Sequence, residues 1–158
     1  PQPHYLEAGA AYGDELATTD GWAKMNRHHW LRDYPDFARF FFGQMTTEPH
    51  SSKAIEDATA WAVEGSVEVM LAEREADFPW DLEAIEAKAR AVRCRMLLVH
   101  GTEDRCQSID RARRLAELTG APLIEVTGAN HMIPGRHPVL ANLLIRDFVR
   151  GLSVGVDR

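Results

Sequence analysis

Two side chains suited to proton transfer, Asp104 and His131, each follow a short and mainly apolar segment of the sequence. Asp104 follows residues 96–99 and a Gly-Thr-Glu turn, and His131 follows residues 123–126 and a short Gly-Ala-Asn loop. Short, mainly apolar segments that are soon followed by glycine are typical of buried strands. The carboxyl ends of parallel strands lie together at the edge where open sheets bind ligands. We therefore expect Asp104 to orient His131 and stabilise its cation while His131 accepts and returns a proton.

Neighbouring side chains provide alternatives to this pair. Taken alone, an Asp or a His in a loop is as often a turn residue as a catalytic one, and Glu103 is the alternative acid if Asp104 points away. Asp110 stands where a helix is predicted to begin, and a negative charge there suits the helix dipole. Cys106 is interpreted as a small packing residue, because nothing near it resembles a turn that stabilises a thiolate.

The histidines and cysteines do not predict a metal site. His28 and His29 are adjacent, so on a helix they face different directions, and His137 is expected at the surface before a proline. Cys94 and Cys106 lack the spacing of zinc ligands. We expect no metal and no cofactor.

The second half of the chain alternates strands with helices. A helix begins at Asp81, and a capped helix from Ser108 to Gly120 connects the strands at 96–99 and 123–126. A last helix ends near Gly151. Strand, helix and strand at this spacing predict a right-handed parallel crossover. Two strands make a small parallel sheet, so we expect a further strand beside it.

The first ninety residues predict helices and turns. Residues 1–13 are expected to form a loop and residues 14–31 a helix that Gly21 weakens. Asp20 is a possible cap within it, so two shorter helices are the alternative. Pro35 suits the first turn of a new helix. Apolar side chains then recur at helical spacing, and Ser51 or Ser52, and later Ser66, are predicted helix caps. The recurring side chains are those of Phe37, Phe40, Phe41 and Met45.

Composition excludes several classes of function. The 158 residues are 45% hydrophobic with a net charge of −6, which suits one globular domain and argues against nucleic-acid and phospholipid surfaces. No apolar run approaches the roughly 18 residues of a membrane span, and no export signal is visible. Two cysteines favour reduced thiols and a cytoplasmic location. The absence of an initiator Met suggests a processed or excised chain.

The His-Gly-Thr-Glu-Asp and Gly-Ala-Asn-His segments, with a helix and a short strand between them, resemble the carboxyl-terminal part of α/β-hydrolase-fold enzymes. In that family the nucleophile precedes the acid and the acid precedes the histidine, so the resemblance makes Asp104 the acid and His131 the base. It covers residues 81–149 well, and residues 1–80 only as a helical cap-like region. Asn130 replaces a residue that is often small, and no Gly-x-Ser-x-Gly occurs in the 158 residues.

The resemblance implies an α/β fold in which a helical cap (1–80) precedes a partial parallel sheet (81–152) and a tail (153–158). It implies part of a hydrolase for an ester-like or related small apolar substrate, with the nucleophile missing from this chain. The missing amino-terminal half, or a second copy of the chain, would pair with the sheet edge. The side chains of Trp30, Phe37 and Phe41 would line the substrate pocket, although a core role explains such aromatic faces more often.

Two other functions are compatible with the sequence. The first is a non-catalytic binding or assembly module that retains the hydrolase half-fold. The second is a complete small enzyme that uses Cys106 or a serine of the cap-like region as its nucleophile.

Overall fold

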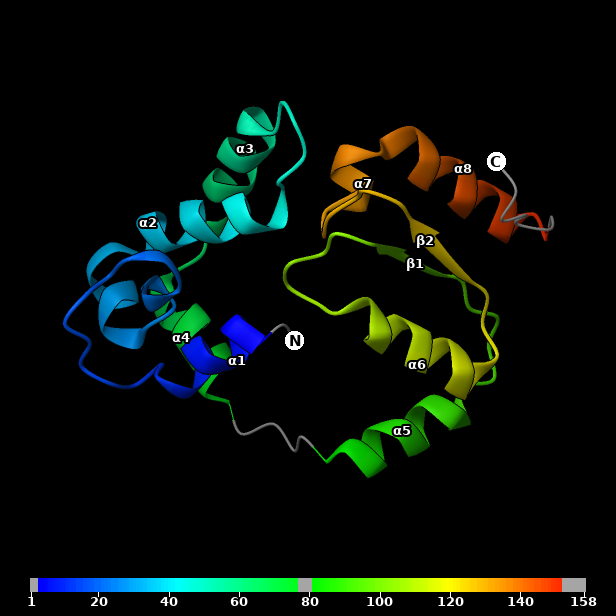
Figure 1. Cartoon of the computed structure of the whole chain (residues 1–158), viewed down its shortest axis with the longest axis horizontal. Helices are drawn as coiled ribbons and strands as arrows, with labels where there is room; N and C mark the ends of the chain where they lie inside the picture. Colours follow the sequence, from blue (N-terminus) through cyan, green and yellow to red (C-terminus); the bar gives the residue numbers. More distant parts are fainter. Residues whose placement is uncertain (1–2, 77–80, 152–158) are drawn as a thin grey trace. The chain divides into compact units, whose positions relative to one another are not determined.

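The computed structural model describes residues 3–76 and 81–151, which belong to two units, Pro1–Phe78 and Pro79–Arg158 (Figure 1). Among the described residues, the first unit is helical and the second carries a two-stranded parallel sheet. The predicted class, a helical region followed by a partial parallel sheet, is confirmed. The predicted tail 153–158 lies outside the described residues. No described helix has the length and apolar character needed to cross a membrane.

The first unit begins differently from the prediction. It contains α1 (Pro3–Ala10), a short 3₁₀ helix η1 (Gly21–Lys24), α2 (Arg27–Met45), α3 (Ser52–Ala62) and α4 (Val67–Glu75). The predicted loop at 1–13 is therefore wrong over residues 3–10, and the predicted single helix at 14–31 is wrong. Asp20 does stand directly before a helical segment, as the alternative of two shorter helices expects, but its side chain makes no cap hydrogen bond.

Asn26 explains where the long helix begins. Its side-chain oxygen accepts hydrogen bonds from the backbone N–H groups of His28 and His29, so it caps α2. Its side-chain amide donates to the carbonyl oxygens of Ala11 and Asp14, which holds the preceding segment in a non-helical path. A local hydrophobic pattern does not reveal contacts of this kind.

Helix α2 bends at Asp33, where φ is −155° and ψ is 70°. The Asp33 carboxylate accepts a hydrogen bond from the backbone N–H of Asp36 at 3.1 Å, as an N-cap does. Pro35 therefore lies in the first turn of the second half of α2, and its predicted position is confirmed.

The predicted starts of three other helices are confirmed. Ser66 accepts from the backbone N–H of Val69 at α4, and Asp81 accepts from that of Glu83 at α5 (Leu82–Ala91). Ser108 caps α6 (Ile109–Thr119), which ends at Gly120 in the left-handed conformation. At α3, Ser51 occupies the cap position, but its hydroxyl donates to the carbonyl oxygen of Glu48 instead of accepting from an amide.

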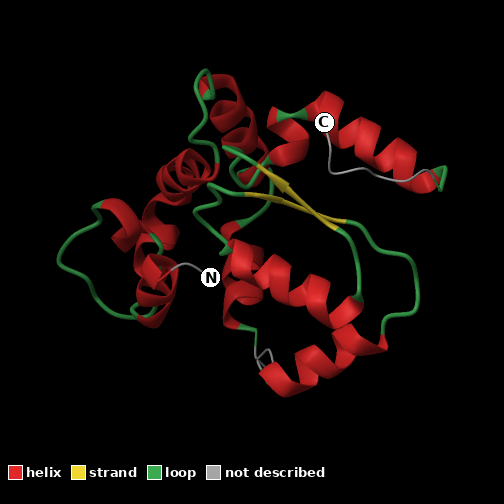
Figure 2. Cartoon of the chain, turned by 45° about the vertical axis from the view of Figure 1, so that its right-hand side comes forward, coloured by secondary structure: helices red, strands yellow, loops and turns green. Residues whose placement is uncertain are grey.

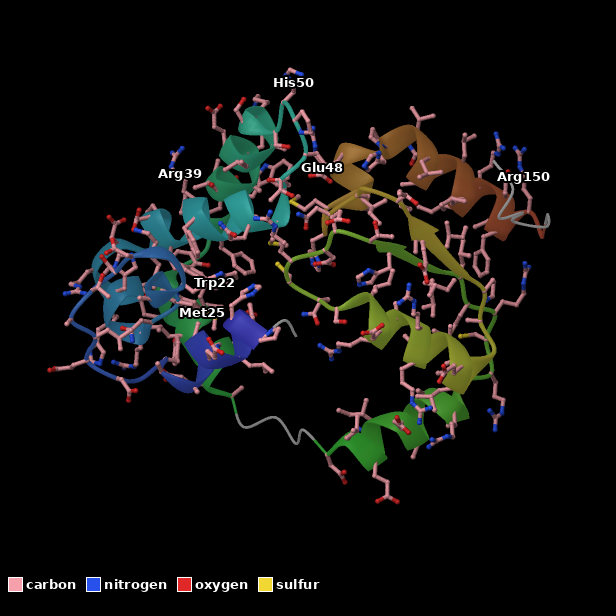
Figure 3. All side chains as sticks on the ribbon, viewed as in Figure 1. Trp22, Met25, Arg39, Glu48, His50 and Arg150 are labelled. Atoms are coloured by element: carbon pink, nitrogen blue, oxygen red, sulfur yellow. The ribbon has the colours of Figure 1, made fainter. Side chains whose placement is uncertain are left out.

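The core of the first unit is an aromatic cluster between α2 and α4. Its buried members are Met25, Trp30, Tyr34, Phe37 and Leu71, and the partly buried side chains that pack against it include Trp22 and Phe41. Met25 and Trp22 are labelled in Figure 3. Burial of this much aromatic surface supplies the main favourable free energy of folding for the unit.

In the second unit, β1 (Leu98–Gly101) and β2 (Leu123–Val126) pair in parallel, with Leu98 opposite Leu123 and Gly101 opposite Val126. Figure 2 shows the two strands between α6 on one side and α7 (Ile133–Arg136) and α8 (Pro138–Val149) on the other. The predicted β2 is confirmed, while β1 begins two residues later than predicted. The ladder starts there because the backbone N–H of Leu98 donates to the carbonyl oxygen of Pro122.

Candidate functional site

The loops that follow β1 and β2 are held together at Gly101. A Cβ atom added to Gly101 would lie 2.2 Å from the backbone oxygen of Ala129, so only glycine permits this approach. Beyond it, the backbone N–H of Glu103 donates to the same Ala129 oxygen at 3.0 Å. The N–H of Gly128 donates to the Thr102 hydroxyl at 2.9 Å. These contacts place the residues after β1 beside the residues after β2.

The predicted pair is formed across these loops. Asp104 Oδ2 lies 2.8 Å from His131 Nδ1, and only 8% of Asp104 is exposed. The other oxygen of Asp104, Oδ1, accepts from the backbone N–H groups of Cys106 at 2.7 Å and Gln107 at 2.9 Å. An ionised carboxylate can only accept, so we assign the proton of a neutral His131 to Nδ1 and leave Nε2 as the proton acceptor. Asp104, and not Glu103, is the acid that contacts His131.

Asn130 stabilises the loop that carries the histidine. It is fully buried, and its side-chain oxygen accepts from the backbone N–H of His131 at 2.8 Å and from that of Arg105 at 3.3 Å. Sequence reasoning treated Asn130 only as a departure from a family pattern and missed this role. Its position directly before the histidine was the available signal.

Two opposing effects act on the Asp104 carboxyl. Burial raises its pKa, while the hydrogen bonds from His131 and from the backbone N–H groups of Gln107 and Cys106 lower it, and the net result is a lowered pKa. Asp104 is therefore an anion at neutral pH. That charge stabilises the His131 cation that forms when the imidazole takes up a proton.

The lowered pKa of Asp104 predicts a loss of stability in acid. In the unfolded chain this carboxyl titrates near its ordinary value of about 3.9, and in the folded chain it titrates lower. The stability that this carboxylate contributes is therefore fully present at a pH above its ordinary pKa. It is lost as the pH falls through the lower pKa that the group has in the folded chain. In urea denaturation between pH 6 and pH 3, wild type should lose more stability than Asp104→Asn.

A neighbouring acid provides the control for this pH dependence. Glu103 is adjacent and exposed, and Glu103→Gln should keep the acid sensitivity of wild type. If Asp104→Asn instead loses as much stability as wild type over this pH range, the carboxylate does not titrate as the geometry requires.

Cys106 lies beside the pair but is not prepared for nucleophilic attack. The residue is 3% exposed, and burial, with a smaller contribution from the Asp104 charge, raises the pKa of its thiol to about 12. Its sulfur, a carboxylate oxygen of Asp104 and a ring nitrogen of His131 lie within 4.8 Å of one another, so the three could in principle face one metal ion. A protonated thiol and a carboxylate already bonded to His131 fit an acid–base pair better. The interpretation of Cys106 as a packing residue agrees with this burial.

The second ring nitrogen of His131 is available for chemistry. About a third of the side chain is exposed, and the described residues show no hydrogen bond to Nε2. The ring lines a hollow of about 470 Å³ beside β1 and α8, together with apolar side chains such as Leu97, Ile133 and Phe148. A group that enters this hollow can exchange a proton with His131.

The predicted substrate-binding residues lie in the first unit. Trp30 and Phe37 are each 6% exposed and belong to the core cluster, and Phe41 packs against them partly buried. All three line a cavity of about 340 Å³. The structure thus brings the three rings together and, separately, brings Asp104 and His131 together in the second unit.

One contact of the acid had no counterpart in the sequence reasoning. His100 Nε2 lies 3.6 Å from Asp104 Oδ2, the same oxygen that His131 contacts. The histidine was visible in the His-Gly-Thr-Glu-Asp segment, but its distance to the acid depends on the turn between them.

Comparison of the chain with protein-family models and with curated proteins finds no match.

Proposed function

We propose that this chain supplies the acid and the base of an α/β-hydrolase-type enzyme. The observation that supports it is the 2.8 Å contact between a buried, anionic Asp104 and Nδ1 of an accessible His131. In the proposed reaction a Ser, Asp or Cys from outside these 158 residues attacks an ester-like or related bond of a small apolar substrate. With Ser or Cys, His131 Nε2 takes the proton of the nucleophile and returns it to the leaving group. His131 then activates the water that releases the product, while Asp104 stabilises its cation.

The nucleophile is proposed to arrive on an element that pairs with β1. The backbone N–H groups of Leu98 and Thr102 donate toward β2, so strand alternation directs the N–H and carbonyl of Val99 to the opposite edge. Two mainly apolar hollows meet at Val99, one of about 600 Å³ toward α5 and α6 and one of about 470 Å³ toward α8. A strand with apolar side chains on both faces would fill them. It would come from an amino-terminal half of the enzyme or from a second copy of the chain.

A small apolar ligand is proposed to bind within the first unit. The cavity lined by Trp30, Phe37 and Phe41 has the aromatic lining and the size of a small-molecule site. A reducing, cytoplasmic location is also proposed, because Cys94 and Cys106 are both free thiols.

Hydrolysis of an activated ester tests the function of the pair. Without its nucleophile the chain should hydrolyse p-nitrophenyl acetate only slowly, through the exposed imidazole, and not at the rate of a complete triad. His131→Ala should reduce this activity to the rate of the buffer. Asp104→Asn should also reduce it, because the anion that supports the imidazolium is lost.

His50 provides the matched control for this assay. It is an exposed histidine in the turn before α3, and its φ of 61° is a conformation that asparagine tolerates (Figure 3). His50→Asn should hydrolyse the ester at the wild-type rate. Hydrolysis that does not respond to His131→Ala would contradict the proposal and favour a non-catalytic module.

Labelling with a fluorophosphonate tests whether the nucleophile lies outside the chain. We expect mass spectrometry to find no modified serine or cysteine among the 158 residues. Stoichiometric modification of Cys106 or of a serine in the first unit would instead identify a complete small enzyme.

A further inference from the structure

The cavity of the first unit is lined by charged side chains as well as by aromatic rings. Besides Trp30, Phe37 and Phe41, the side chains of Glu73 and Arg74 line its volume of about 340 Å³. Both charged residues are exposed and lie in the last turn of α4. A cavity that joins an apolar interior to exposed charges suits an amphipathic ligand with a small apolar body.

Arg74 is held in place without the use of its hydrogen-bond donors. Its guanidinium carbon lies 5.2 Å from the ring centroid of Tyr12, and Tyr12 packs edge-on against Trp30 with the ring centroids 5.3 Å apart. Among the described residues this guanidinium has no hydrogen bond and no ion pair, because Glu75, the next acid along α4, is paired with Arg27 at 2.8 Å. The N–H donors of Arg74 are therefore open to a ligand, and their fork matches the two oxygens of a carboxylate.

The two charges act on different parts of the first unit. The pKa of Tyr34, which lines the cavity, is raised first by burial and then by the charge of Glu73. The pKa of Tyr12 is raised by burial and by a carboxylate, and the charge of Arg74 opposes this rise. The anion thus acts toward Tyr34 and the cation toward Tyr12, so a ligand carboxylate on the Tyr12 side meets a positive charge.

The rings of the lining do not form a cage for a cation. The centroid of Phe37 lies 4.6 Å from that of Trp30 at an interplanar angle of 34°, and 5.5 Å from that of Phe41 at 28°. A cation binds to the negative face of an aromatic ring, and these contacts cover the ring of Phe37 with neighbouring rings. An anion at Arg74 is therefore favoured over a cation among the rings.

We propose that the cavity of the first unit binds a small aromatic carboxylate, with its ring beside Trp30, Phe37 and Phe41 and its carboxylate on the guanidinium of Arg74. This inference rests on the ligand site of the proposed function and names the class of molecule that the site takes. The ring contributes apolar and aromatic contact, and the carboxylate selects against uncharged molecules of the same shape.

Isothermal titration calorimetry of the 158-residue chain with two matched probes tests this assignment. Phenylacetate and phenethyl alcohol share a ring and a chain length, and only the first carries a carboxylate. Wild type should bind phenylacetate about tenfold more tightly, which is the effect of one charge-assisted contact at an exposed side chain. Arg74→Gln should bind both probes equally, with the wild-type affinity for the alcohol. Arg74→Lys keeps the charge without the fork and should retain part of the preference.

Two further variants locate the site. Arg39 is an exposed arginine on α2 that does not line the cavity, so Arg39→Gln should keep the tenfold preference of wild type (Figure 3). Phe41→Ala should weaken the binding of both probes by the same factor, because it removes a ring that the two probes contact alike.

Equal affinity of wild type for the two probes would overturn the proposal, and so would an unchanged preference in Arg74→Gln. Tighter binding of phenethylammonium, the cation with the same skeleton, would overturn it as well. If Arg74→Gln does not fold, the comparison of the three probes in wild type decides. Binding of none of them would contradict the ligand site itself. Ester hydrolysis by the Asp104–His131 pair does not enter this test, so the two failures are distinguishable.

Discussion

Replacement of Gly101 by alanine is expected to destabilise the second unit by about 4 kcal/mol or more. The added Cβ would lie 2.2 Å from the backbone oxygen of Ala129 and 2.6 Å from that of Asn130, and both are backbone atoms that cannot rotate away. Relief of this overlap must separate the loop after β1 from the loop after β2. Urea denaturation followed by far-UV circular dichroism measures the loss, and the NMR signals of the His131 ring report whether the pair survives.

Gly135 offers a matched control in the same unit. A Cβ added there would meet only the Met132 methyl at 3.8 Å, which is an ordinary contact. Because Gly135 lies in α7, alanine should be neutral or stabilise by about 0.5 kcal/mol. If Gly101→Ala is as stable as Gly135→Ala, the two loops do not approach each other as described.

The same close approach explains why the candidate pair was predictable from the sequence. Each partner follows a short apolar strand, and glycine stands where β1 must pass close to the next loop. These are local signals, and they coincide with the parallel pairing of β1 and β2. Asp104 and His131 therefore meet as the spacing predicts.

The parts that escaped prediction depend on contacts between distant residues. The start of α2 is determined by the Asn26 cap, together with the bond from the backbone N–H of Arg27 to the carbonyl oxygen of Tyr12. The contact of His100 with Asp104 depends on the turn after β1. Hydrophobic periodicity carries no information about such bonds, so it predicts a helix at 14–31 and assigns no contact to His100.

Phe37→Ala is expected to destabilise the first unit by about 3–5 kcal/mol. The ring is 6% exposed, and its centroid lies 4.6 Å from that of Trp30 and 5.5 Å from that of Phe41. Its removal leaves a void among aromatic neighbours that cannot close without moving α2. Urea denaturation followed by tryptophan fluorescence measures the loss, because Trp30 packs directly against the ring.

Leu31 is the control for this loss and separates the two roles that the sequence left open. It lies on the same helix but is 50% exposed, so Leu31→Ala should cost less than about 1 kcal/mol. A Phe37 that only lines a substrate cavity would behave like Leu31 in this measurement. A loss of 3 kcal/mol or more would instead show that Phe37, a buried member of the core cluster, contributes to the stability of the unit. The partly buried Phe41 would then be the better position at which to alter substrate binding without unfolding the unit.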